Sequence, residues 1–218
     1  DEPRSGGESL SGRRTDGGLI MLQLQNVQVN YGAAPALWGI DLEVRPSALV
    51  SVIGPNGAGK TSLLKIMLGE LPADSGQVRR GSNLQVAYYD QQRDQLDLNA
   101  TLEDFISPGS EWIEIGNRRQ HVKSYLGDFL FSPARAAAPV RTLSGGERNR
   151  LLLARLFARP ANVLVLDEPT NDLDIDTLEL LEQLVQEYDG TVFVVSHDRS
   201  FLDAVVTSTL VFEGDGRW

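Results

Sequence analysis

One short segment carries the residue types and spacing of a phosphate-binding loop. It reads Gly54-Pro55-Asn56-Gly57-Ala58-Gly59-Lys60-Thr61 and fits the pattern G-x-x-x-x-G-K-[ST]. Glycines in such a loop let backbone N–H groups turn inward around phosphates, and the helix that follows adds the positive end of its dipole. The lysine reaches the β- and γ-phosphates, and the threonine hydroxyl ligates Mg²⁺. We therefore predict a site for Mg²⁺ and a nucleoside triphosphate, formed by Gly54, Asn56, Gly57, Ala58, Gly59, Lys60, Thr61 and Ser62.

An acidic pair, Asp167-Glu168, comes directly after the apolar run at 162–166. Ligands of open α/β sheets gather at the carboxyl ends of the strands, so this pair is expected to project towards the phosphates. We assign Asp167 to the Mg²⁺ shell and Glu168 to polarising the attacking water. Alone, the pair would also fit a solvated acidic turn before Pro169. Its place after a phosphate loop favours the catalytic interpretation.

Two further polar residues follow predicted strands. His197 comes after the apolar run at 191–195, so we expect it at the same edge of the sheet, in contact with the γ-phosphate or the catalytic water. A packed or surface histidine is the weaker alternative. Gln91 follows the run at 85–89, and an amide there would touch Mg²⁺ or the water. Gln92 is adjacent, so the choice between the two glutamines stays open.

A second glycine-rich turn, Leu143-Ser144-Gly145-Gly146-Glu147, precedes a strongly helical stretch at 148–158. Serine and two glycines at a helix N-terminus form an anion site from backbone donors. The composition also fits a helix cap with a tight turn. Because the chain already has one phosphate loop, the economical hypothesis is that Ser144, Gly145 and Gly146 bind the ATP of another module.

The elements that must position these residues alternate between strand and helix. Strands are predicted at 21–29, 40–44, 49–53, 85–89, 162–166 and 191–195, and helices at 61–68, 151–158 and 178–188. Such alternation, interrupted by a mixed, mainly helical insert, indicates an α/β domain with a mainly parallel sheet. Thr101 with an acid three residues later resembles a helix N-cap. Tyr31, after the first strand, is a candidate for stacking on adenine, although an ordinary turn aromatic fits nearly as well.

Composition limits the class of protein. The chain has 218 residues, 41% of them hydrophobic, which is enough for one compact domain with a sizeable core. It has no cysteine, and no apolar run approaches the ~18 residues of a membrane span, so a cytoplasmic location is the simplest expectation. The net charge of −10 argues against a general-purpose nucleic-acid binder.

Basic residues nevertheless cluster in three places, for which a solvated face is the simplest expectation. These are Arg79-Arg80, the group Arg118, Arg119, His121 and Lys123, and the series Arg148, Arg150, Arg155 and Arg159. His121 is expected to be a surface residue. The second group would also suit phosphate contacts on RNA or DNA. Residues 1–20 are rich in Gly, Ser, Arg and Asp and are expected to form a flexible tail or linker end of a fragment.

Taken together, the phosphate loop, the Leu143–Glu147 turn, the Val163–Pro169 segment and Ser196-His197-Asp198 resemble the ATP-binding cassette (ABC) ATPases, over about residues 22–212. The resemblance implies a single cassette at 21–218: a P-loop core, an antiparallel β-subdomain, and a helical subdomain at about 93–158 that carries the signature turn. It also implies that two cassettes pair head to tail around ATP. Ser47-Ala48 departs from the family's usual glycine plus acid.

Within this family, Glu168–Asp174 is similar to the ABC-F group, and Val86–Gln91 and Leu126–Phe131 to the second cassette of its Uup type. The resemblance implies an ATPase without membrane insertion, in a protein that acts on ribosomes or branched DNA. The segment from Tyr31 to Val44 reads equally like an importer ATPase, so an importer subunit is the alternative. A third hypothesis is a nucleotide-gated clamp on DNA, in which ATP hydrolysis only resets binding.

Overall fold

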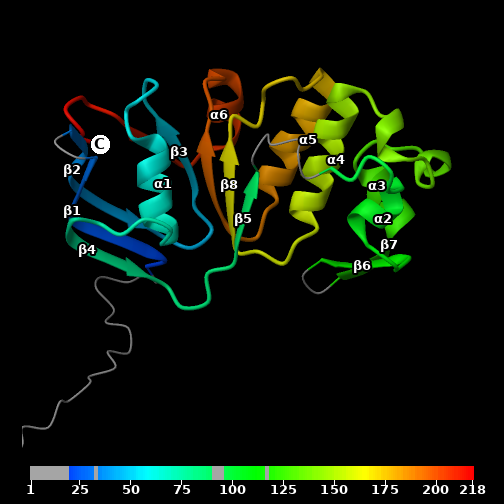
Figure 1. Cartoon of the computed structure of the whole chain (residues 1–218), viewed down its shortest axis with the longest axis horizontal. Coiled ribbons are helices and arrows are strands. Elements are labelled where there is room, and N and C mark those ends of the chain that lie inside the picture. Colours follow the sequence, from blue (N-terminus) through cyan, green and yellow to red (C-terminus); the bar gives the residue numbers. More distant parts are fainter. Residues whose placement is uncertain (1–19, 32–33, 90–95, 116–117) are drawn as a thin grey trace, which may run out of the picture.

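The fold is seen in a computed structural model that describes residues 20–31, 34–89, 96–115 and 118–218, without the side chains of residues 31, 34 and 35. A five-stranded sheet forms its centre, with a three-stranded sheet on one side and a helical region on the other (Figure 1). This arrangement confirms the predicted α/β class, the antiparallel β-subdomain and the helical subdomain.

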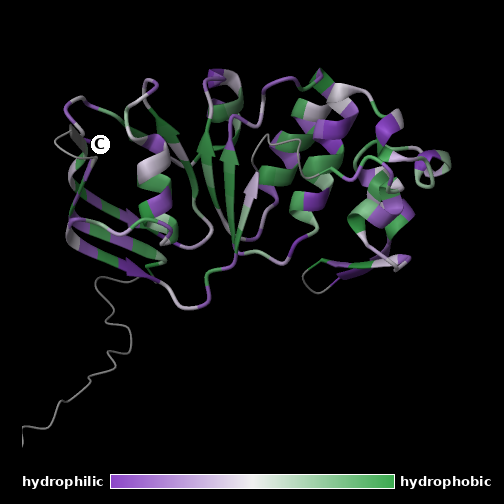
Figure 2. Ribbon diagram, in the orientation of Figure 1, coloured by the Kyte–Doolittle hydropathy of each residue, from purple (hydrophilic) through white to green (hydrophobic). Residues whose placement is uncertain are grey.

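All the strands of the central sheet run parallel, in the order β10-β3-β9-β8-β5. They are β3 (Leu49–Ile53), β5 (Val86–Tyr89), β8 (Val163–Asp167), β9 (Thr191–Val195) and β10 (Ser208–Val211). Alternate residues of β8 and β9 enter different hydrophobic clusters, so that Val165 lies in one cluster and Leu166 in the other. Both faces are therefore covered, and the central strands read as continuous apolar runs (Figure 2).

The antiparallel sheet lies against the face of the central sheet that carries α1 (Lys60–Leu68), as Figure 1 shows. Its order is β2-β1-β4, from β1 (Leu22–Tyr31), β2 (Ala34–Val44) and β4 (Ser75–Arg80). The turn before β3 forms although Ser47 replaces the usual glycine, and Ser47 adopts a left-handed φ of 58°. That substitution therefore leaves the strand leading into the phosphate loop intact.

The other face of the sheet carries α4 (Gly145–Phe157), α5 (Ile175–Gln186) and α6 (Arg199–Val205). Beyond α4 lie α2 (Leu102–Ile106) and α3 (Val122–Asp128), with 3₁₀ turns at Pro133–Arg135 and Val140–Thr142. Helix α2 begins as predicted, because the Thr101 side chain accepts a hydrogen bond from the Asp104 N–H.

The insert also contains a β-hairpin that the sequence did not predict. Its strands, β6 (Trp112–Ile115) and β7 (Arg118–His121), pair antiparallel. His121 was expected to be a surface residue, and the structure adds a capping role. It is half-buried, and its Nδ1 accepts a hydrogen bond from the Lys123 N–H, so it caps α3. No helix in the described ranges is both long and apolar enough to cross a membrane.

Candidate functional site

The phosphate loop connects the end of β3 to the start of α1, as the motif requires. Gly59 is the N-cap of α1, with a left-handed φ of 89°, and no side chain caps the helix. A Cβ at Gly59 would lie 2.7 Å from the Ala36 carbonyl oxygen, so both conformation and space demand glycine there. The amides at the start of α1 are therefore left without a capping side chain, at the positive end of the helix dipole.

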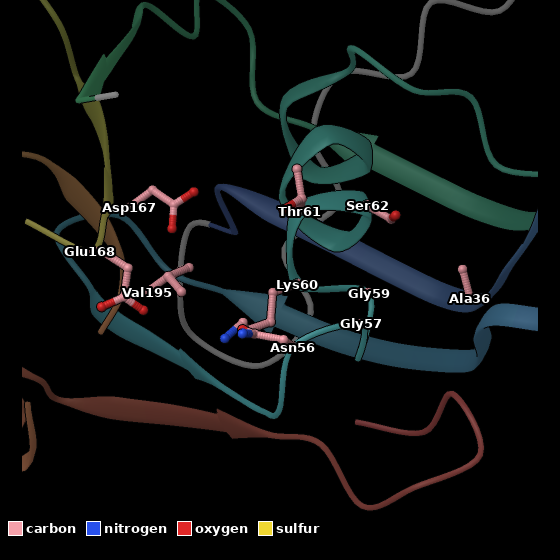
Figure 3. Close-up of a pocket in the computed structure, with 10 residues that line it drawn as sticks. All are labelled: Ala36, Asn56, Gly57, Gly59, Lys60, Thr61, Ser62, Asp167, Glu168 and Val195. Atoms are coloured by element: carbon pink, nitrogen blue, oxygen red, sulfur yellow. The ribbon is translucent and has the colours of Figure 1, made fainter. Parts of the chain in front are cut away.

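A cavity of about 460 Å³ opens at this loop. Figure 3 shows Lys60 and Thr61 on one side of it and the carboxylates of Asp167 and Glu168 on the other. Lys60 Nζ donates a 2.9 Å hydrogen bond to the Gly54 carbonyl, which holds the ammonium group at the loop. The cavity is lined by Ala36, Asn56, Gly57, Gly59, Lys60, Thr61, Ser62, Asp167, Glu168 and Val195.

The acidic pair lies where the order of the strands predicts it. Asp167 is the last residue of β8, and Glu168 follows in a left-handed conformation with φ of 47°. The Glu168 N–H donates to the Val195 carbonyl at the end of β9, with an N···O distance of 2.7 Å. A positive φ is unusual for a residue with a long side chain, and such strained residues are enriched at functional sites. The hydrogen bond between Glu168 and Val195 joins the ends of the neighbouring strands β8 and β9 beside the cavity.

His197 lies beside Glu168, in agreement with its predicted place at this edge of the sheet. Its Nε2 is 3.3 Å from Glu168 Oε1. The imidazole is 63% exposed, whereas the glutamate side chain is only 23% exposed. The histidine thus forms the outer, solvent-facing member of the pair and is free to meet a ligand from the open side.

The Leu143–Glu147 turn begins α4 with a reciprocal cap. The Ser144 side chain accepts from the Glu147 N–H, and the Glu147 carboxylate accepts from the Ser144 N–H at 2.8 Å. The Ser144 N–H and the contact with Arg135 hold the pKa of Glu147 below its ordinary range. Neither Ser144, Gly145 nor Gly146 belongs to the described lining of the phosphate-loop cavity. Helix α4 begins at Gly145, directly after this cap and before the predicted helical stretch at 148–158.

Two predicted site residues escape a structural description. Gln91 lies outside the described residues, and so does the side chain of Tyr31. Their roles stay predictions. For Mg²⁺, the described residues offer the Thr61 hydroxyl and the Asp167 carboxylate on one cavity, but no cluster of three or more His, Cys, Asp or Glu. This donor set fits Mg²⁺, which commonly takes one or two carboxylates and completes its shell with phosphate oxygens and water.

Sequence reasoning did not identify Ala36 and Val195 as cavity residues, and no residue-type signal points to either. It was also wrong about part of the basic series. Arg155 lies with its guanidinium 4.3 Å from the Phe105 ring centroid, where burial lowers its pKa. The Arg150 side chain is only 12% exposed and is paired with Asp174. Neither belongs to a solvated face.

Comparisons with known proteins agree with this geometry. A family model described as "ABC transporter" matches residues 37–171, which is more than half of the chain. The ATP-binding protein Uup of Escherichia coli (strain K12) is 50% identical over 92% of the chain, and the energy-dependent translational throttle protein EttA of the same strain is 39% identical over 90%. The chain spans about a third of these relatives, 32% of Uup and 36% of EttA.

The fold also matches a solved structure. The ATP-binding cassette MJ0796, determined as a dimer in a post-hydrolysis state bound to ADP and Pi, aligns with a TM-score of 0.67 and 24% identity. The alignment covers 90% of this chain and 96% of that one, which shows the shared fold. The predicted likeness to ABC-F proteins of the Uup type is confirmed. The chain belongs to the ATP-binding cassette family and is an ATPase domain of that family.

Proposed function

We propose that this domain binds Mg²⁺-ATP at the phosphate loop and hydrolyses it when paired head to tail with a second cassette, in the same chain or in a second copy. The observation that carries the proposal is the division of the site. Lys60, Thr61, Asp167 and Glu168 share one cavity, whereas the Ser144–Gly146 turn lies outside it. A signature turn that lies outside the cavity of its own cassette is suited to closing the site of a partner.

The roles within the cavity follow from its chemistry. The loop amides and Lys60 bind the β- and γ-phosphates, and bound Mg²⁺, held by Thr61 and Asp167, would neutralise phosphate charge. Glu168 accepts the proton of the attacking water, and His197, 3.3 Å from Glu168, holds the γ-phosphate or the water in line. Gln91 completes the metal and water contacts, and Tyr31 stacks on adenine.

The first experiment uses Glu168→Gln in the full-length protein that carries this cassette. The amide keeps the shape of the side chain but is a far weaker base, so ATP binding should persist while turnover falls by about 10²–10⁴-fold. The cassette pair should also live longer with ATP bound. The matched control is Glu182→Gln on α5, remote from the cavity. Turnover within a few-fold of wild type would move the base elsewhere, with His197 the next candidate.

For the physiological target we propose a ribosome-associated role in the cytoplasm. The name of the relative EttA, a translational throttle protein, supports this choice. The test is to trap the Glu168→Gln protein with ATP and to identify the molecules bound to it. The alternatives predict other bound molecules, namely branched DNA or, for an importer subunit, a permease. Ribosomal RNA in the trapped complex is the expected result. A membrane permease, or DNA resistant to ribonuclease, would replace the proposal.

The hairpin β6–β7 is the surface we propose for phosphate contacts on that target. Arg118 and Arg119 are exposed, and Arg119 lies 4.9 Å from the ring centroid of Trp112, itself 45% exposed. Lys123 already pairs with Glu103 at 3.6 Å, so we expect it to contribute least. Exposed aromatic and guanidinium groups side by side suit RNA bases and phosphates.

Changing Arg118, Arg119 and Lys123 to alanine should therefore weaken association of the full-length protein with ribosomes. The dependence of log K on log[salt] should flatten by up to about 1 unit per lost contact, as measured by co-sedimentation at several salt concentrations. Alanines at Arg45, Lys65 and Arg79, also exposed, give a control with the same charge change. If both triple variants weakened association equally, the hairpin would contribute only through the net charge of the protein and not as a specific contact surface.

A further inference from the structure

The segment after β10 folds into a tight turn beside the phosphate loop. The Phe212 N–H donates to the Ile53 carbonyl at 2.9 Å, so the pairing of β10 with β3 continues up to the residue before the loop. The chain then reverses over Gly214–Arg217, whose first and last residues share a 2.9 Å backbone hydrogen bond. The two central residues, Asp215 and Gly216, have φ of 50° and 76°, a conformation that an Asp-Gly pair favours. The turn therefore sends the chain back towards the phosphate loop.

Trp218, just after this turn, lies against the first glycine of the phosphate loop. Its ring centroid is 5.5 Å from that of Phe212. A Cβ placed on Gly54 would lie 2.9 Å from Phe212 Cβ and 3.5 Å from Trp218 Cη2, so no side chain fits there. The Gly54 carbonyl in turn accepts from Lys60 Nζ at 2.9 Å. Gly54 thus contacts the aromatic pair through its Cα and the lysine of the loop through its carbonyl.

Packing, not a polar contact, holds Trp218 in this place. The side chain is half-buried against the hydrophobic cluster that contains Val52. Its Nε1 is buried and has no hydrogen-bond partner in the part of the chain that the structure describes. A buried N–H of this kind costs free energy, which the contact area of the ring must offset. We therefore expect a phenyl ring to serve the same purpose, whereas alanine would leave a gap behind Gly54.

The same turn is attached to β2, which contributes to the cavity. The Gly216 carbonyl accepts from the Trp38 N–H at 2.8 Å, and a Cβ on Gly216 would lie 3.3 Å from Trp38 Cβ. Figure 1 shows the segment, in red, beside β2. On the same strand, Ala36 lines the cavity, and its carbonyl oxygen lies against Gly59. The first and last glycines of the phosphate loop are therefore both held from outside, one by Trp218 and the other by β2.

We propose that residues 212–218 form a clasp that holds the phosphate loop in its ATP-binding conformation, with Trp218 as the positioning residue. The inference rests on the proposed function, in which this loop binds the phosphates. A loop that is already ordered loses little conformational freedom when ATP binds. Without Trp218, Gly54 would gain freedom, and ATP binding would have to supply the missing order. The clasp therefore acts on affinity, whereas Glu168 and His197 act on turnover.

The first test is Trp218→Ala in the full-length protein that carries this cassette. We expect the Kd for Mg²⁺-ATP to rise by about 5- to 30-fold, while kcat at saturating ATP stays within about two-fold of wild type. Amide hydrogen exchange over residues 54–59 should be faster in the variant without nucleotide. Trp218→Phe keeps a ring behind Gly54 and should restore most of the affinity. Val185→Ala, a buried truncation on α5 outside the cavity lining, is the control for lost stability.

A second variant, Gly216→Ala, loosens the clasp at its attachment to β2. The new Cβ would crowd Trp38, and the left-handed φ of 76° would be strained. This variant should also raise the Kd for ATP, and combined with Trp218→Ala it should cost less than the sum of the separate effects. Gly109→Ala is the matched control, because Gly109 has a similar φ of 71° but an added Cβ there meets no described atom within 4 Å.

Two results would overturn the inference. One is that Trp218→Ala and Val185→Ala both lower the urea midpoint and both keep the wild-type Kd, which would make the segment merely structural. The other is a loss of affinity that Trp218→Phe does not restore, because packing would then not be the cause. The wild-type titration separates the two proposals. A wild type without affinity for ATP contradicts the proposed function, whereas normal wild-type affinity matched by Trp218→Ala contradicts only the clasp.

Discussion

The two helices that begin at glycine-rich turns, α1 and α4, treat their first amides in different ways. Helix α1 follows Gly59 and has no side-chain cap. Helix α4 follows Ser144, whose hydroxyl and whose partner Glu147 form a complete capping box. In addition, α1 carries a lysine at its first position, whereas α4 carries an acid in its first turn. Both turns have the composition of an anion site, yet only the second of these two helices has a side-chain cap.

This difference predicts different functions for the N-termini of α1 and α4. An uncapped N-terminus with a nearby cation attracts phosphate by itself, because the amides, the dipole and Lys60 all act on the same anion. At α4 the cap already satisfies the N–H groups of Ser144 and Glu147, so the helix is stable without a ligand and has fewer donors to offer. Such a turn suits a contact made to a nucleotide that another surface has already bound.

The variant with the largest expected effect on this contrast between the N-termini of α1 and α4 is Lys60→Ala. Lys60 is the cation at the phosphate loop, and its loss removes a charge-assisted contact to the phosphates. We expect the Kd for ATP, measured by titration with a fluorescent analogue, to rise by more than about 100-fold. The fold should survive, because among the described residues the ammonium bonds to the Gly54 carbonyl alone, and it lies at the cavity.

Lys65→Ala is the control for this variant. It lies on the same helix, exposed in the last turn, and should leave the affinity for ATP unchanged. Wild-type affinity in Lys60→Ala would instead show that the amides of α1 bind phosphate without the cation. The contrast between the two helix starts would then rest on capping alone.

The site could be predicted further than the insert, for a physical reason. Strands β3 and β9 were predicted at their observed residues, because a strand buried on both faces reads as a short apolar run. The residues at the carboxyl ends of β3, β8 and β9 then converge by topology. Asp167, Glu168 and His197 needed no tertiary information beyond a parallel sheet.

The insert lacked such a signal. Strands β6 and β7 form a two-stranded hairpin with one buried apolar residue, Ile113. Apolar–polar alternation extends only over Ile113–Ile115, and β7 is entirely polar, so the pattern is too short to mark a strand. The partners of Arg150 lie 24 and 27 residues away in the chain, and no local rule connects them. Composition therefore predicted a solvated face for Arg150, whereas tertiary packing covers most of its side chain. Long-range side-chain pairing was the part that only the structure supplied.

A smaller effect is expected for Ser144→Ala, which removes half of the capping box. Loss of such a cap costs about 0.5–2 kcal/mol of unfolding free energy, measurable by urea titration. ATP binding to the cassette's own phosphate loop should not change, because Ser144 is outside that cavity. Thr101→Ala, which removes the cap of α2, is the matched control for stability. Equal losses of ATP turnover in both would reduce Ser144 to a structural role.

The smallest expected effect concerns the charge of Glu147. Glutamine at this position can still accept the Ser144 N–H, so Glu147→Gln isolates the charge from the cap. A carboxylate in the first turn is worth about 0.3–1 kcal/mol through the helix dipole. Because the folded protein holds the pKa of Glu147 below 4.5, this stabilisation is fully present above about pH 4.5 and is lost as the pH falls through the lower, folded value.

The difference in urea midpoint between wild type and variant should therefore be constant from pH 7 to 5 and shrink below that. A difference that persists unchanged at pH 3 would assign the effect to the geometry of the Arg135 contact, and the two helix starts would then differ in shape rather than in charge.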